Sequence, residues 1–164
     1  MKSVKKLVYS AVFAALIAVL TMFVHIPVPM ISGYVNLGDV MIIVACFCIG
    51  YYALPAAAIG SAIADLFGYA AYAPVTFVVK LAMAAVTCLI LSKNKGMFFV
   101  IFASIICELI MAFGYFAYEY IAFGPTYAVP NLPANFIQAA AAVILGPIVV
   151  FVVKKLKLMR FVEN

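Results

Sequence analysis

The chain has 164 residues, of which 70% are hydrophobic and 9% are charged, and its mean hydropathy is +1.30. This composition excludes a soluble globular protein, because so few charged residues cannot cover a surface that faces water. The net charge of +5 does not indicate nucleic-acid binding, because the basic residues flank apolar stretches instead of forming a patch. The sequence predicts an all-α integral membrane protein, since helices satisfy their own backbone hydrogen bonds in lipid.

Proline, glycine and charged residues divide the chain into six apolar segments, which predict six transmembrane helices in a single membrane domain, residues 1–164. The segments are residues 7–25, 40–53, 55–71, 75–92, 97–122 and 134–154. The second and third are short for a full crossing, which takes about 20 residues. The first segment also has the basic start of a signal peptide, but no clear cleavage site follows it, so we interpret it as an uncleaved span.

The basic residues predict the orientation of these spans. All of them except Lys80 lie before the first segment, after the fourth or after the sixth, and the three opposite loops have none. By the positive-inside rule, both termini are therefore cytoplasmic. The outer stretches "IPVPMISGYVNLGD" and "FGPTYAVPNLP" are rich in Pro, Gly and Tyr, which is typical of loops that order over a site.

Small residues repeat along the first span, where Ala11 and Ala15 overlap with Ala14 and Ala18. Small residues four positions apart form a flat groove against which another helix can lie, from this chain or from another.

Two aspartates lie at the edges of the second and third spans. Asp39 opens the second span, where a carboxylate caps the positive end of a helix, and we expect a capping role. Asp65 lies among Gly60, Ala64 and Gly68, a series that permits close helix approach, so we expect a structural anchor. The four cysteines lie in apolar runs and are expected to pack as small hydrophobic residues, with no metal or other cofactor bound.

Lys80 is the one basic residue inside a span. It stands roughly 7 to 8 Å below the outer end of the fourth segment, at 1.5 Å per residue. A charge at that depth costs a few kcal/mol and usually faces the bundle interior beside a partner, although a lysine can also extend outward to the headgroups.

Candidate partners lie on the fifth and sixth spans. Glu108, Ala112, Tyr115 and Glu119 follow one another at spacings that place them along one helix face. We expect one of the two glutamates to pair with Lys80. The sixth span opens with polar amides that again share one side of a helix, namely Asn131, Asn135 and Gln138.

Four of these polar residues fall in the outer third of three consecutive spans, namely Lys80, Glu119, Asn135 and Gln138, and Glu108 lies deeper below them. One interpretation is a buried ion pair with amide hydrogen bonds that fixes helix register. The other is a cavity open to the outer face that holds a small polar molecule between aromatic walls. The aromatic candidates for stacking on a flat ring are Tyr69, Tyr72, Phe77, Tyr115 and Tyr118.

The chain resembles the substrate-binding S components of energy-coupling factor (ECF) vitamin transporters. The resemblance is based on the six spans, the alanine groove, "YVNLGD" before the second span, "DLFGY" closing the third and "NFIQ" opening the sixth. It covers nearly the whole length. It is strongest to the branch for pyridoxine or hydroxymethylpyrimidine, with riboflavin-type members close by.

The resemblance implies a riboflavin-transporter-like bundle in a bacterial plasma membrane, which captures a vitamin from outside. The implied substrate-binding residues are Asn36, Phe77, Lys80, Glu108, Tyr115, Glu119, Asn131, Asn135 and Gln138. It also implies that Ala11, Ala14, Ala15 and Ala18 contact a membrane coupling subunit driven by two ATPase subunits. The chain has no Gly-rich nucleotide-binding motif, so we expect those partners to hydrolyse ATP and this chain to be no enzyme.

Two other functions remain open at this stage. A standalone ion-coupled carrier would also place Glu and Lys within the membrane. An intramembrane enzyme could use Glu108 and His25, but a metal would need more ligands than the sequence offers. Among vitamins, a buried lysine would favour an anionic or phenolate group, which suits pyridoxine.

Overall fold

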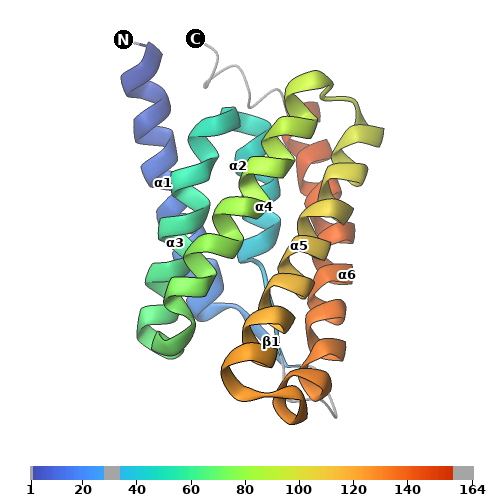
Figure 1. The fold of residues 1–164 in the computed structure, drawn as a ribbon. Helices are drawn as coiled ribbons and strands as arrows, with labels where there is room; N and C mark the ends of the chain where they lie inside the picture. Colours follow the sequence, from blue (N-terminus) through green and yellow to red (C-terminus); the bar gives the residue numbers. More distant parts are fainter. Residues whose placement is uncertain (1, 28–33, 157–164) are drawn as a thin grey trace.

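The computed structural model describes residues 2–27 and 34–156, and the side chains of residues 4–24 and 37–156 (Figure 1). Six α-helices form a bundle: α1 (Lys2–Phe23), α2 (Gly38–Ile49), α3 (Ala53–Gly68), α4 (Ala73–Lys93), α5 (Met97–Phe123) and α6 (Pro125–Lys155). Two 3-10 turns, Gly50–Tyr52 (η1) and Ala70–Tyr72 (η2), join α2 to α3 and α3 to α4. Strands β1 (His25–Pro27) and β2 (Tyr34–Asn36) pair antiparallel between α1 and α2, with His25 opposite Asn36.

The prediction of six transmembrane helices is confirmed in part. Five stretches of the described chain are long and apolar enough to cross a membrane: Val4–Phe23, Gly38–Gly68, Ala70–Lys93, Met97–Phe123 and Pro125–Lys155. The second stretch contains both α2 and α3. These helices have 12 and 16 residues, fewer than the roughly 20 of an independent crossing.

Successive helices run in alternating directions, so α1 begins and α6 ends at the same end of the bundle (Figure 1). The η1 turn and the short connection from α4 to α5 lie at that end as well. The β-hairpin, η2 and the connection from α5 to α6 lie at the opposite end.

Helix α2 forms the centre of the bundle. It packs against all five other helices, and ten of its twelve residues are buried. A helix that is apolar on every face is stable only where neighbours surround it. Because α2 is short and central, its first turn lies inside the protein, and this places Asp39 among the other helices.

Lys95 satisfies a backbone carbonyl group at the other end of α2, and Lys154 lies beside it. Lys95 Nζ donates a hydrogen bond of 3.0 Å to the carbonyl oxygen of Phe47, and Lys154 Nζ donates one of 3.1 Å to the carbonyl oxygen of Lys95. Both ammonium groups also lie within 6 Å of the centre of the Phe47 ring. Cations at a helix C-terminus compensate its unpaired carbonyl groups, so these lysines anchor α2 to the end of the bundle that holds the termini.

The close helix approach predicted around Gly60 is confirmed. A Cβ atom at Gly60 would lie 2.5 Å from the carbonyl oxygen of Ala14, so α1 and α3 are in backbone contact there. A Cβ at Gly68 would meet no atom within 4 Å, so only part of the small-residue series serves this contact. Small side chains let membrane helices approach closely and gain dispersion contacts.

The start of the sixth helix differs from the prediction. The stretch "FGPTYAVPNLP" was expected to be a loop, but only Gly124, with φ of 85°, separates α5 from α6. Pro125 is at the first helical turn, where its missing N–H costs nothing. Pro130 and Pro133 lie inside the helix and each removes one backbone hydrogen bond. Packing of these first turns against α5 outweighs that loss, which local propensity could not show.

Candidate ligand-binding site

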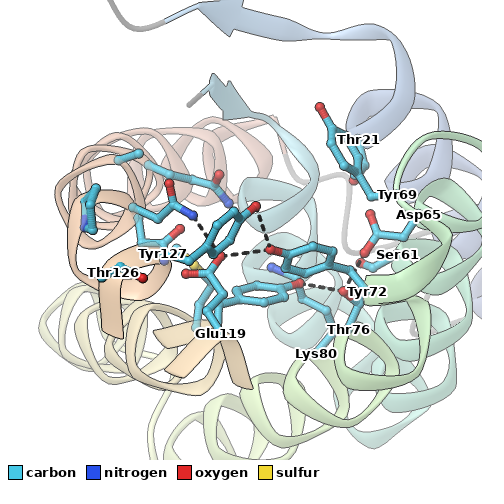
Figure 2. Close-up of a pocket in the computed structure, with 17 residues that line it drawn as sticks. Thr21, Ser61, Asp65, Tyr69, Tyr72, Thr76, Lys80, Glu119, Thr126 and Tyr127 are labelled. Atoms are coloured by element: carbon cyan, nitrogen blue, oxygen red, sulfur yellow. Dashed lines mark hydrogen bonds between the residues drawn. The ribbon is translucent and has the colours of Figure 1, made fainter. Parts of the chain in front are cut away.

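A cavity of about 770 Å³ lies in the half of the bundle away from the termini. Figure 2 shows the side chains that line it. It is formed by the end of α1, the later half of α3, η2, the first half of α4, the later half of α5 and the first half of α6. Its lining residues are Thr21, Ser61, Asp65, Tyr69, Tyr72, Thr76, Lys80, Met111, Tyr115, Glu119, Thr126, Tyr127, Pro130, Asn131, Ala134, Asn135 and Gln138.

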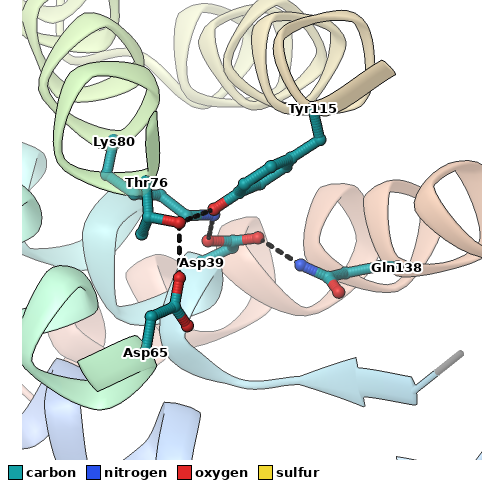
Figure 3. Close-up of polar contacts among 6 residues, drawn as sticks. All are labelled: Asp39, Asp65, Thr76, Lys80, Tyr115 and Gln138. Atoms are coloured by element: carbon teal, nitrogen blue, oxygen red, sulfur yellow. Dashed lines mark hydrogen bonds and ion pairs between the residues drawn. The ribbon is translucent and has the colours of Figure 1, made fainter. Parts of the chain in front are cut away.

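An ion pair between Lys80 and Asp39 lies at the deep end of this cavity (Figure 3). Lys80 is the eighth residue of α4, about 10 Å along the helix from its first residue. Gln138 Nε2 of α6 donates a 2.7 Å hydrogen bond to Asp39 Oδ2. The Asp39 carboxylate is therefore bonded through both oxygens, and it ties α2 to α4 and α6.

Two predictions about these residues are wrong. Asp39 makes no side-chain capping hydrogen bond, and Leu37 holds the N-cap position of α2. The partner of Lys80 is Asp39, not a glutamate of the fifth span. The physical reason is the central position of α2, which brings its first turn against α4 at the depth of Lys80. The positive N-terminal end of α2 also favours a carboxylate there.

A second series of hydrogen bonds, next to this ion pair, links α3, α4 and α5. Thr76 Oγ1 of α4 donates to Asp65 Oδ2 of α3, and it lies 2.9 Å from the Tyr115 hydroxyl of α5. Thr76 has one hydroxyl proton, so if that proton goes to Asp65, Tyr115 must donate to Thr76. Figure 3 shows these groups side by side with the ion pair. Asp65 thus anchors α3, as the sequence predicted, and it also lines the cavity.

Aromatic and polar side chains gather where η2, the end of α5 and the start of α6 meet (Figure 2). The Tyr72 hydroxyl donates to Glu119 Oε1 at 3.1 Å and lies 3.4 Å from the Tyr127 hydroxyl. Asn131 Nδ2 lies 3.5 Å from the same glutamate oxygen. The Tyr72 ring also lies 6.3 Å from the Tyr115 ring, centroid to centroid. These contacts fix Glu119 in place while leaving aromatic faces around the cavity.

Some buried polar atoms of the lining have no hydrogen-bond partner within the described residues. They are Ser61 Oγ, Glu119 Oε2 and Asn135 Nδ2. An unpaired buried polar atom costs about 1 to 3 kcal/mol, so native proteins rarely keep one without a purpose. A ligand with matching donors and acceptors would satisfy these atoms.

Comparison with known proteins decides the family. A family model for the ECF-type riboflavin transporter S component matches residues 1–155 of the chain. The chain belongs to this family. The S-component resemblance inferred from the sequence is therefore confirmed. The protein is a multi-pass cell-membrane protein of a vitamin transporter family, not an enzyme family.

The S component also has a similar protein in Pyrococcus woesei, described as "Uncharacterized protein in gap 3'region". The two are 29% identical over 140 residues, which cover 85% of this chain and 95% of the relative.

Six of the nine predicted substrate-binding residues of this S component line the cavity: Lys80, Tyr115, Glu119, Asn131, Asn135 and Gln138. Phe77 is 41% exposed and is not among the lining residues. Glu108 is buried away from the lining, and neither of its carboxylate oxygens has a hydrogen-bond partner in the described chain. Asn36 ends β2, and its side chain lies outside the described residues.

Several lining residues were not predicted as ligand contacts. Asp65 was interpreted as an anchor in preference to a ligand contact, and Ser61 and Thr76 were not singled out. The sequence contains a signal for Asp65 and Ser61, because they are four positions apart and therefore share a helix face. Tyr127 lay in a stretch expected to be a loop, so its helical position could not be assigned.

The four alanines of the α1 series differ in their exposure. Ala11 and Ala15 are exposed on the bundle surface, whereas Ala14 and Ala18 are half-buried. The backbone of Ala14 lies against Gly60 of α3. The exposed pair is therefore the part of the series that is available to another protein.

Metal-ligating side chains are not clustered in the part of the chain that the structure describes. No group of three or more His, Cys, Asp or Glu residues there could hold a metal ion. The four cysteines are free thiols, and three of them are fully buried in the core.

Proposed function

We propose that this S component captures a small B-vitamin-type heterocycle in the cavity between α3, α4, α5 and α6. The observation that carries the proposal is the cavity itself. Its volume falls within the range of about 300 to 1,000 Å³ typical of small-molecule sites, and aromatic walls and unpaired polar atoms line it. The candidates are pyridoxine, hydroxymethylpyrimidine and riboflavin, since each combines a flat ring with hydroxyl groups.

Pyridoxine was favoured because a buried lysine could meet its phenolate group. Lys80 is already bonded to Asp39, so its charge is not available for a phenolate. The match to the riboflavin transporter S component family supports riboflavin as an equal candidate.

The site opens toward the outer face in this proposal. The described basic residues other than Lys80 lie at the end of the bundle that holds the start of α1 and the end of α6. By the positive-inside rule that end is cytoplasmic. The chain then crosses the membrane six times, and the two short helices α2 and α3 form a hairpin that makes two of these crossings. The cavity is in the other half, so a vitamin enters it from outside.

Transport then depends on partners. The exposed Ala11 and Ala15 face of α1 contacts a membrane coupling subunit, and two ATPase subunits supply the energy. The S component alone binds the vitamin and does not concentrate it.

Native mass spectrometry of the protein purified from a vitamin-rich host tests the binding step, because a tightly held vitamin adds its mass to that of the chain. We expect one vitamin per protein chain. Proteoliposomes then separate the proposed function from an ion-coupled carrier. Protein alone should bind radiolabelled vitamin without accumulation under a proton or sodium gradient, and accumulation under such a gradient would contradict the S-component mechanism.

A further inference from the structure

The α3 wall of the cavity contains two polar residues one helical turn apart. Ser61 and Asp65 face the cavity from the same side of α3 (Figure 2). They lie across the cavity from Glu119 of α5 (Figure 2). The cavity therefore has polar groups at two opposed walls, and none of the substrate-binding residues expected from the sequence lies on α3.

Ser61 is 2% exposed, and its hydroxyl has no hydrogen-bond partner among the described residues. A serine inside a helix usually bonds back to a carbonyl oxygen one turn earlier, and Ser61 does not. Its hydroxyl is therefore free to donate to, or accept from, a molecule in the cavity.

Asp65 also keeps capacity for a ligand. One carboxylate oxygen, Oδ2, accepts the hydrogen bond from Thr76, and a carboxylate offers about four acceptor sites. Glu119, on the opposite wall, is 5% exposed and has its Oε2 unpaired in the described structure. Both walls consequently offer acceptors, which suit hydroxyl or protonated nitrogen groups of a ligand.

Positive charge is not available to balance an anion. Lys80 is the only lysine or arginine among the described residues that line the cavity, and it is bonded to Asp39. A phosphate or carboxylate group would have to displace Asp39 or enter without a counter-charge, and an unpaired buried charge is strongly unfavourable.

We propose that Ser61 and Asp65 form a second recognition subsite for an uncharged or cationic, hydrogen-bond-donating end of the ligand, so that the cavity excludes phosphorylated forms of the same vitamin. This inference rests on the proposed vitamin-binding function and adds to it a rule for selection by charge. The hydroxyl arms of riboflavin and pyridoxine meet this description, whereas their 5'-phosphates do not.

The experiment compares each vitamin with its phosphate ester. Dissociation constants are measured for riboflavin and riboflavin 5'-phosphate by quenching of flavin fluorescence. Those of pyridoxine, hydroxymethylpyrimidine and their phosphate esters are measured by calorimetry. For the intact protein, we expect the ester of the vitamin that binds to bind at least about a hundredfold more weakly than the alcohol, because its phosphate brings between one and two negative charges without a counter-charge.

The variants are Asp65→Asn, which keeps an acceptor for Thr76, and Ser61→Ala. Asp65→Asn should reduce the ratio of the dissociation constants of ester and alcohol by roughly tenfold, because it removes a negative charge from the cavity wall. Ser61→Ala should weaken binding of the alcohol about tenfold, the value of a hydrogen bond to an otherwise unpaired group. Ser104→Ala is the matched control, because Ser104 is a buried helical serine outside the lining that bonds to the carbonyl oxygen of Val100.

Each outcome has a separate meaning. Equal affinity of the intact protein for alcohol and ester, or an unchanged ratio in Asp65→Asn, would overturn the subsite while leaving vitamin binding established. An effect of Ser61→Ala no larger than that of Ser104→Ala would also overturn it. If the intact protein binds neither riboflavin, pyridoxine nor hydroxymethylpyrimidine, the proposed function fails and this inference fails with it.

Discussion

The ion pair between Asp39 and Lys80 provides a direct test of how the bundle is held together. Asp39 is 1% exposed and Lys80 is 4% exposed, and the pair joins the central helix α2 to α4. Asp39→Asn leaves the ammonium group without a counter-charge, and Lys80→Met leaves the carboxylate without one. The double variant Asp39→Asn with Lys80→Met removes both charges while keeping similar side-chain volumes.

The magnitude follows from Coulomb's law and from the cost of desolvation. At a contact distance of about 3 Å and an effective dielectric constant of about 20, the attraction is roughly 5 kcal/mol. Removal of one partner of a buried pair typically costs about 3 to 5 kcal/mol, because the remaining charge stays buried. Removal of both is often nearly neutral. We therefore expect each single variant to lose about 3 kcal/mol of unfolding free energy and the double variant to lose much less than the sum.

Reversible unfolding in mixed detergent micelles, followed by far-UV circular dichroism, measures these free energies for the four proteins of the cycle. A parallel vitamin titration tests the role of the pair in binding, where Lys80→Met should weaken affinity. Single variants that each lose under about 1 kcal/mol, with additive losses in the double variant, would refute the reasoning. That result would mean that Lys80 is solvated and that the pair contributes little. Unchanged vitamin affinity in Lys80→Met would remove Lys80 from the binding site.

Three further variants test separate parts of the structure. Gly60→Ala should cost about 1 to 3 kcal/mol of unfolding free energy, because its Cβ would lie 2.5 Å from a backbone oxygen of α1. Gly68→Ala on the same helix meets no atom within 4 Å and serves as the control, so equal losses would contradict the contact. Tyr115→Ala should weaken vitamin affinity about tenfold in a binding titration through loss of an aromatic wall, whereas Phe77→Ala, outside the lining, should leave it unchanged. A larger loss of affinity in Phe77→Ala than in Tyr115→Ala would place the ligand outside this cavity. Ala15→Trp should preserve vitamin binding and abolish ATP-driven uptake in liposomes that contain the coupling module, and normal uptake would move the partner interface away from this face of α1.

Much of the site could be predicted from the order of residues along each helix. Lys80 stood out because a charge within an apolar segment is costly, and Glu119, Asn135 and Gln138 fell at a similar depth. The cavity lining includes all four. Depth is a property of position along one helix, so it can be read from a single sequence at 1.5 Å per residue.

The partners across helices could not be predicted in the same way. Asp39 looked like a cap because it opens a span, and only the central place of α2 brings it to Lys80. The first turns of α6 looked like a loop because of Pro130 and Pro133, and packing against α5 made them helical. In both cases, contacts between helices outweighed the local preference of a short stretch of sequence.

The amino-acid sequence by itself determined that the chain is a helical membrane protein with six apolar segments, and that it keeps polar residues near one end of the bundle. These properties follow from the cost of placing backbone and charge in lipid, which each segment meets alone. The tertiary structure decided which charges pair, which atoms remain unpaired and where the cavity lies. Hydropathy and periodicity describe one helix at a time, whereas an ion pair or a cavity depends on how helices face one another.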